Sequence, residues 1–294
     1  MLTLSVSASG ARAQEMEPRA YVNTPIGMNF LLLGVVHTDG NVAFDPALPI
    51  TDAKLRTTSG SLGLAHTLDV AGQSGKLALV LPYTHLRGHA LYQGDPVERD
   101  VTSFGDPLIR FSANFHGAPA LSLKEFAGYR QDLIIGSSVL VAAPLGQYNP
   151  GRVVNIGGNR WFVKTELGIS KARDRWTLEI APGVTFFSDN DDFFGGKKRS
   201  QDPFYSVQSH LVYSFPSGVW AALNATWYSG GRTTINGVLN NDLQNNTRVG
   251  ATLVFPIDRY NSVRIQASTG VATRTGSDLD FYGVAWQYRW GGGL

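Results

Sequence analysis

The sequence predicts an all-β protein, a closed antiparallel transmembrane β-barrel of about twelve strands with short periplasmic turns and longer extracellular loops. Three observations carry this prediction. Apolar residues recur at every second position along most of the chain, whereas helical periodicity is nearly absent. The connections between the predicted strands alternate between long and short. The chain also ends on a strand, residues 281–290, whose bulky aromatic side chains share one face.

Period-two segments bounded by turn-forming residues indicate strands. They are 28–37, 60–70, 76–86, 105–116, 132–143, 160–171, 176–188, 203–215, 219–229, 246–255, 262–273 and 281–290. Residues 160–171 show the pattern clearly, because Trp161 and Leu167 share one face while Lys164 and Glu166 share the other. An even number of strands is typical of single-chain bacterial outer-membrane barrels.

The connections sort by length. The long ones are 38–59, 87–104, 144–159, 189–202, 230–245 and the shorter 274–280, and the short ones are 71–75, 172–175, 216–218 and 256–261. This arrangement places both termini on the tight-turn, periplasmic side. The connection 117–131 is longer than its neighbours on that side. Ser122 and Glu125 have the spacing of a capping box, which indicates one or two helical turns there, with a plain extended loop as the alternative.

A membrane-spanning strand must pair its backbone polar groups within the sheet, so only a closed barrel is possible. Its outer face carries an apolar band with aromatic girdles at both interfaces. Aromatic residues gather at the predicted strand ends; they are Tyr83, Trp161, Trp176, Phe186, Phe215, Trp220, Trp227, Tyr228, Phe255 and Trp290. In the last strand the lipid-facing side chains are expected to be Tyr282, Val284, Trp286, Tyr288 and Trp290. A soluble sheet could bury the same rings in a core, but it has no reason to sort its loops by length.

Composition excludes several classes of protein. Charged residues make up 16% of the 294 residues, and the net charge is +2, so nothing favours a nucleic-acid partner. The chain has no cysteine, which excludes a thiol nucleophile, disulfides and a Cys-ligated zinc site. No apolar run reaches the roughly 18 residues of a membrane helix.

The start of the chain resembles a targeting segment. A short apolar stretch ends in Ala11-Arg12-Ala13, the A-x-A pattern of a secretory signal cleaved after Ala13, although a positively charged beginning is missing. We therefore expect a signal peptide at 1–13, an N-terminal periplasmic segment at 14–27 and one barrel domain at 28–294. Because the positively charged beginning is missing, either the first residue of the sequence is assigned too late or this stretch is not a signal.

If the aromatic faces contact lipid, the opposite faces line the lumen. The candidate solute-pathway residues are then Asp106, Arg110, Lys164, Glu166, Glu179, His210, Arg248, Arg264 and Arg289. Charges inside a barrel can set selectivity. In the alternative, they pair across strands and prop the barrel open or fill it. Inward-facing glycines, among them Gly136 and Gly168, leave room for a narrow passage or for close backbone packing.

The most distinctive loop is "SDNDDFFGGKKR", residues 188–199. Asp189, Asp191 and Asp192 are weak candidates for a Ca²⁺ site, because the spacing is not that of a known calcium loop; a solvated acidic loop is favoured, and no metal is expected. Phe193 and Phe194 are expected at the extracellular mouth, as a lid or as a contact for an apolar solute.

Nothing in the sequence favours an enzyme. Some outer-membrane barrels hydrolyse lipids, but here no nucleophile–base pair is evident beside the lipid-facing His66 and His85. The serine-hydrolase, zinc-protease and phosphate-loop motifs are also missing from the sequence. No catalytic residue and no cofactor are expected.

Several stretches resemble a known family. They are "SFGDPLIRFSANF" (103–115), "VLVAAPLGQYNP" (139–150), "VNIGGNRWFVKTELGIS" (154–170), "WTLEIAPGVTFFSDNDDFFGG" (176–196) and the end "AWQYRWGGGL". In these stretches the chain resembles the outer-membrane proteins grouped as "putative meta-pathway of phenol degradation". Gly105-Asp106 and Pro144-Leu145-Gly146 match its pattern. The resemblance implies an integral outer-membrane barrel of a Gram-negative cell and, loosely, movement of small or hydrophobic compounds.

The function expected from this reasoning is passive uptake of small hydrophobic or aromatic compounds through an outer-membrane channel. The expected partners are outer-membrane lipid, a small solute and the barrel-assembly machinery, which recognises a final strand ending on an aromatic. A structural or adhesive surface barrel with a blocked lumen is the first alternative, and a lipid-hydrolysing membrane enzyme is the second. A barrel this small keeps little open lumen once side chains fill it, so gating or a plug is expected.

Overall fold

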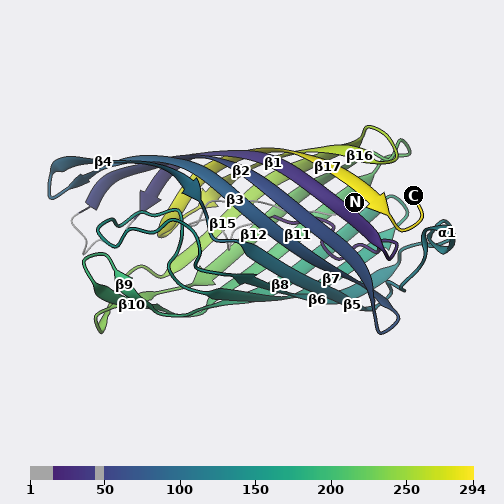
Figure 1. The fold of residues 1–294 in the computed structure, drawn as a ribbon, viewed down its shortest axis with the longest axis horizontal. Helices are drawn as coiled ribbons and strands as arrows, with labels where there is room; N and C mark the ends of the chain where they lie inside the picture. Colours follow the sequence, from purple (N-terminus) through teal and green to yellow (C-terminus); the bar gives the residue numbers. More distant parts are fainter. Residues whose placement is uncertain (1–15, 44–49) are drawn as a thin grey trace.

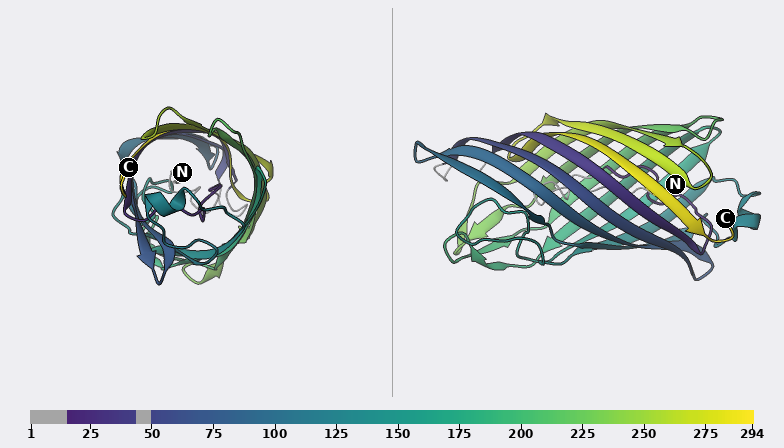
Figure 2. Two further views of the ribbon diagram at one scale, coloured as in Figure 1. Left: turned by 90° about the vertical axis from the view of Figure 1, so that its right-hand side faces the viewer. Right: turned by 45° about the horizontal axis from the view of Figure 1, so that its top comes forward.

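The strands close into one antiparallel barrel. The computed structural model describes residues 16–43 and 50–294, and the expected signal peptide, 1–13, lies outside the described residues. The wall has twelve strand positions, and the first and last strands pair in register from Met28↔Gly291 to Ala43↔Gly276. The end-on view shows the closed ring, and the side view shows the tilted strands (Figures 1 and 2). The predicted fold class is therefore confirmed.

Twelve wall positions are filled by thirteen strands, because β4 and β5 share the position beside β3. The wall strands are β1 (Met28–Ala43), β2 (Ile50–Val70), β3 (Gln73–Tyr92), β4 (Asp95–Phe104), β5 (Leu108–His116), β6 (Leu133–Ala142), β7 (Phe162–Arg173), β8 (Trp176–Phe187), β11 (Phe204–Ser214), β12 (Trp220–Gly230), β15 (Gln244–Pro256), β16 (Asn261–Ala272) and β17 (Gly276–Gly291). A second, four-stranded sheet lies at the long-loop end; its strands are β9 (Asn190–Phe193), β10 (Lys197–Gln201), β13 (Thr233–Ile235) and β14 (Val238–Leu239).

The first four strands extend far beyond the membrane. A spanning strand needs about 9–11 residues, whereas β2 has 21 and β3 has 20. The sequence predicted loops at 38–59 and 87–104, and most of these residues are strand instead. Both faces of this extension meet water or loops, so its sequence lacks the alternation of apolar and polar residues that lipid contact imposes. The sequence pattern therefore gave no sign of strands there. Similarly, the loops predicted at 189–202 and 230–245 contain the short strands of the second sheet.

The outer face is apolar between two aromatic rims. Leu223 of β12 is 66% exposed, and Leu178 and Leu211 lie beside it in register. The predicted girdle residues Trp161 and Trp227 are exposed on this face. Such a band facing outward on a closed sheet is the surface that hydrocarbon tails cover.

Two of the aromatics predicted for the girdle face inward instead. Trp220 is 2% exposed and Tyr228 is fully buried. Both share the inner face of β12 with Asn224, because residues two apart in a strand point to the same side. Trp227 takes the outer position, so its neighbour Tyr228 must point into the barrel.

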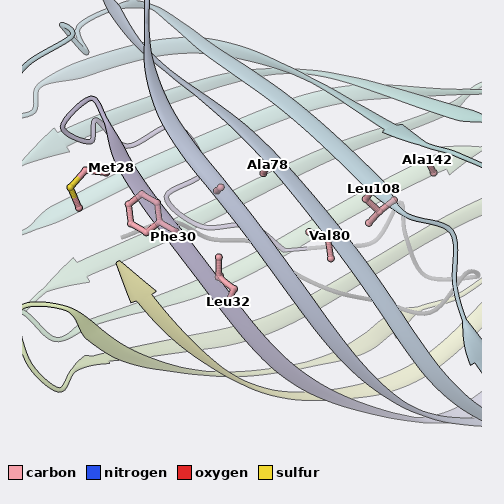
Figure 3. Close-up of a cluster of buried hydrophobic side chains, with 8 residues drawn as sticks. Met28, Phe30, Leu32, Ala78, Val80, Leu108 and Ala142 are labelled. Atoms are coloured by element: carbon pink, nitrogen blue, oxygen red, sulfur yellow. The ribbon is translucent and has the colours of Figure 1, made fainter. Parts of the chain in front are cut away.

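The inner face has an apolar side formed by β1, β2, β3, β5 and β6. Figure 3 shows this cluster, which comprises Met28, Phe30, Leu32, Ala65, Ala78, Val80, Leu108 and Ala142. The sequence analysis placed charged residues in the lumen and did not identify this apolar side. The cluster makes one wall of the interior apolar, while the charged residues described below come mainly from β5 and from β7 to β17.

The connection 117–131 contains α1 (Leu123–Phe126). The Ser122 side chain accepts from the Glu125 backbone N–H, and the Glu125 carboxylate accepts from the Ser122 backbone N–H at 2.9 Å. The predicted capping box is therefore confirmed, and the extended-loop alternative is wrong. Within the described residues, no helix has the length and apolar character needed to cross a membrane.

Candidate functional site in the barrel lumen

The N-terminal segment, residues 16–25, crosses the lumen rather than lying outside the barrel. Its backbone and side chains bond to strands from several sides of the wall. The Glu17 N–H donates to Gln208 on β11 at 3.1 Å, and Lys76 on β3 donates to the carbonyls of Ala20 and Val22, both at 3.1 Å. The segment had been expected in the periplasm. It lies inside because the barrel offers buried polar partners for backbone groups that form no strand. We call it the plug segment.

Glu166 is the centre of the network that holds the plug segment. Its carboxylate accepts a hydrogen bond from the Tyr21 hydroxyl at 3.0 Å and one from Gln208 at 2.8 Å. It also forms ion pairs with Lys164 at 2.9 Å and with Arg110 at 3.3 Å. Arg110 in turn forms an ion pair with Glu17 of the plug segment. These buried charges pair with one another, as the alternative interpretation of the lumen residues expected.

Two glycines make room for the Tyr21 ring. Gly136 and Gly168 face each other across β6 and β7. A Cβ at position 168 would lie 2.1 Å from the Tyr21 ring, and one at position 136 would lie 2.9 Å from it. The space left by these two inward glycines holds the Tyr21 ring, so it is neither the open passage nor the close backbone packing that was expected.

The other predicted lumen residues are spread along the wall. Glu179 accepts from the Arg19 N–H of the plug segment at 2.6 Å. The His210 ring lies 2.8 Å from Asn224 Oδ1, and Arg248 donates to the Leu279 carbonyl at 2.5 Å. Arg264 is buried beside a cavity of about 30 Å³, room for one or two waters.

Arg289 lies at the periplasmic rim. Its Nε donates to the Arg259 carbonyl at 2.7 Å, in the turn between β15 and β16. It is therefore separate from the central network, and it anchors a turn rather than contacting the plug segment.

Asp106 tethers a loop to the wall. It lies in the Gly105-Asp106-Pro107 break between β4 and β5, and its carboxylate accepts from the N–H groups of Gly146 and Gly158, each at 2.9 Å. The structure thus joins the motifs at 105–106 and 144–146 that carried the family resemblance. A Cβ at Gly146 would lie 2.6 Å from the Asp106 backbone nitrogen, which explains the glycine there.

Replacing Asp106 by alanine should release the loop at 143–161. Each hydrogen bond to a charged acceptor is worth about 1.5–3 kcal/mol. Trypsin added to intact cells should then cleave after the exposed Arg152 about 100-fold faster or more, because loss of both bonds makes local opening more frequent. Asp100→Ala is the matched control, since that carboxylate pairs with Arg87 on the exposed outer face. Equal cleavage of both variants would show that Asp106 does not hold the loop.

An open pocket of about 280 Å³ lies at the extracellular end. It is bounded by the extended strands β1–β4, by residues 151–154 of the loop between β6 and β7, and by Phe194. The apolar part of its lining includes Val42, Leu55, Ala90, Val97, Val154 and Phe194. We call it the entrance pocket. Phe194 thus contributes to the mouth of the barrel, while Phe193 packs under the Arg199 guanidinium at 5.1 Å.

The acidic loop is neutralised by lysine. Lys198 forms ion pairs with Asp189 at 2.7 Å and with Asp191 at 3.1 Å. Its ammonium group therefore occupies the place between these two carboxylates that a cation would take. Among the residues of the described ranges, no group of three or more His, Cys, Asp or Glu is placed to hold a metal ion.

Sequence reasoning missed the plug residues Glu17 and Tyr21 and the pocket residues Arg99 and Arg152. Neither the segment nor the loop shows period-two alternation, so no face could be assigned to their side chains. One signal was present for Tyr21. The paired inward glycines Gly136 and Gly168 leave a space of ring size, and an aromatic side chain must fill it.

The chain matches the family described as "Putative MetA-pathway of phenol degradation" over residues 35–288. The chain belongs to this family. The match runs from within β1 to within β17 and includes Asp106, Arg110 and Glu166, whereas the plug segment lies outside it. A search of curated proteins finds no match.

Solved structures show the same fold. An outer membrane channel from Pseudomonas putida F1 superposes with a TM-score of 0.81 at 21% identity, covering 94% of this chain and 100% of that one. The translocator domain of the autotransporter NalP from Neisseria meningitidis has a TM-score of 0.53 at 8% identity, with 92% and 91% covered. The beta domain of the Bordetella autotransporter BrkA has a TM-score of 0.50 at 9% identity, with 90% and 100% covered. The family member described here thus has the fold of outer-membrane β-barrels.

Proposed function

We propose that this family member is an outer-membrane channel for passive uptake of small hydrophobic or aromatic compounds. The observation that carries the proposal is the apolar entrance pocket of about 280 Å³ at the long-loop end of the barrel. An engineered cavity of about 150 Å³ lined by apolar side chains binds benzene, so the entrance pocket has room for one substituted aromatic ring.

The interior of the barrel also supports passage of apolar compounds from the entrance pocket toward the periplasm. Below the entrance pocket, the inner cluster around Phe30, Leu32 and Val80 gives one wall an apolar surface. The plug segment occupies the periplasmic half of the lumen, so a solute passes only when that segment shifts. Because its contacts are mainly hydrogen bonds and ion pairs, water entering the lumen can replace them one by one.

The plug segment also favours the first alternative, a surface barrel whose lumen is blocked. In that case the buried network of Tyr21, Glu166 and Arg110 is a permanent structural core, and function lies in the outer loops. The two functions differ in one measurable property, the permeability of the barrel to small solutes.

Solute entry into intact cells with and without the chain decides between them. We expect faster uptake of phenol and toluene when the chain is present, and unchanged uptake of glucose. Proteoliposomes containing the purified barrel should admit the same two compounds. Equal uptake of phenol, toluene and a fatty acid by cells with and without the chain would favour the blocked barrel. If the chain is a channel and not the lipid-hydrolysing enzyme of the second alternative, lipid hydrolysis in the same vesicles should stay at background.

A further inference from the structure

The entrance pocket combines an apolar lining with two arginines. Arg99 of β4 and Arg152 of the β6–β7 loop both line it. Arg99 is half-buried, and its Nε donates to the Val154 carbonyl at 3.1 Å. This bond fixes the side chain against the loop and leaves the terminal nitrogens of the guanidinium for another acceptor.

Neither guanidinium is neutralised by the protein. Within residues 16–43 and 50–294, no carboxylate forms an ion pair with Arg99 or Arg152. Glu98 borders the pocket, but it alternates with Arg99 along β4 and so points to the opposite face of the strand. Burial and the nearby Arg152 lower the pKa of Arg99. Two like charges held together at the edge of an apolar pocket are stabilised by a bound anion.

A second group of arginines comes from three segments: Arg160 from the end of the same loop, Arg199 from β10 and Arg232 from the connection between β12 and β13. Arg160 packs over the Phe187 ring at 4.4 Å, and burial together with the neighbouring Arg199 lowers its pKa. Arg160 Nη1 and Arg232 Nε are buried, and they have no hydrogen-bond partner within the part of the chain that the structure describes. The combination of guanidinium groups, an aromatic ring and unused hydrogen-bond donors, which resembles the lining of the entrance pocket, therefore extends toward the lumen.

We propose that the entrance pocket binds small amphiphilic anions, each with an aromatic or apolar body and one carboxylate, and that Arg99 and Arg152 hold the carboxylate. The inference rests on the proposed function and narrows its substrate class. A guanidinium matches a carboxylate through two parallel hydrogen bonds. The apolar residues Val97, Val154 and Phe194 contact the ring of the bound molecule, and the volume of about 280 Å³ accommodates benzoate.

The test is equilibrium binding of benzoate to the purified barrel in detergent, measured by calorimetry. Benzamide is the neutral comparison of the same shape. We expect benzoate to bind about 10-fold or more tightly than benzamide, because only the carboxylate pairs with both guanidiniums. The double variant Arg99→Gln/Arg152→Gln should lose this preference while keeping its weak affinity for benzamide.

Arg87→Gln is the matched control. Arg87 lies on the same extended hairpin, but its guanidinium pairs with Asp100 on the outer face, 67% exposed. Removing this charge alters the net charge by one unit without touching the pocket, so the preference for benzoate should stay. The proposal is overturned if benzoate and benzamide bind alike to the unmodified chain, or if the double variant keeps the preference.

The same measurement separates this inference from the proposed transport. If benzoate binds through the two arginines but no aromatic compound enters cells faster, the binding site stands and the channel function is wrong. If toluene and benzamide enter cells faster but benzoate has no binding advantage, the channel stands and the anion preference is wrong.

Discussion

Deleting residues 16–25 should raise the single-channel conductance of the barrel in planar bilayers by about 3-fold or more, because a barrel of twelve wall positions is wider than one whose interior is just filled by its own side chains, and water then enters the space of the plug segment. The deletion leaves the wall intact, since β1 begins at Met28. It removes Glu17 and Tyr21, and the lumen charges they pair with, Arg110 and Glu166, then bind water. Mobile ions can then pass along an open lumen that is lined with hydrated charged side chains.

A disulfide provides the closed counterpart. The chain has no cysteine, so a pair introduced as Tyr21→Cys and Gly168→Cys is unique. A Cβ at position 168 would stand 2.1 Å from the ring of Tyr21, so the two positions lie next to each other. The oxidised variant should conduct less than the unmodified barrel, and reduction should restore or exceed the original conductance. If deletion and disulfide both leave conductance unchanged, the plug segment does not control passage.

The fold was predictable because lipid contact imposes a strict pattern. Every wall strand except β4 overlaps a predicted segment, and the terminal strand carries Tyr282, Val284 and Trp290 exposed on its outer face as expected. The pattern fails where the environment changes from hydrocarbon to water. Above the membrane, β2 and β3 continue with Arg56 and Arg87 on the outside, and such residues carry no strand signal.

The aromatic rims show a different limit. Trp227 and Tyr228 are neighbours, so strand alternation allows only one of them to face lipid. Leu223 and Trp227 share a face, which already assigns Tyr228 and Trp220 to the interior. The girdle prediction used only the nearness of aromatic residues to strand ends and ignored the face on which each one lies, so it included Trp220 and Tyr228 wrongly. Inside the barrel, Trp220 packs beneath the Arg19 guanidinium of the plug segment at 5.3 Å.

The site was predictable only in part, since alternation tells which side chains face inward but not what they meet there. Glu166, Lys164 and Arg110 were expected in the lumen, and they are buried there. Two of their partners, Glu17 and Tyr21, lie in a segment without periodicity, and Tyr21 is 145 residues from Glu166. A contact of that kind depends on the closed barrel as a whole, and no local pattern records it.

Leu223→Arg should destabilise the barrel by about 2–4 kcal/mol in lipid vesicles, the cost of arginine at the bilayer midplane on a barrel surface. Leu223 lies on β12 between the aromatic side chains of Trp227 and Phe215, and its neighbours in register are Leu211 and Ala251. The free energy of unfolding in a urea titration measures the loss. No partner group near Leu223 can accept the guanidinium's donors in hydrocarbon, so the cost has no local compensation.

Leu239→Arg makes the same exchange in the extracellular hairpin, where Leu239 is 57% exposed against 66% for Leu223. The exposed fraction alone would predict that arginine is tolerated equally well at positions 223 and 239. Lipid around β12 predicts a large loss at Leu223 and almost none at Leu239, because the second arginine stays in water. The comparison therefore tests directly whether lipid or water surrounds the outer face at Leu223. Equal stability of the two variants would mean that water, or another protein, covers the band that is assigned here to the membrane.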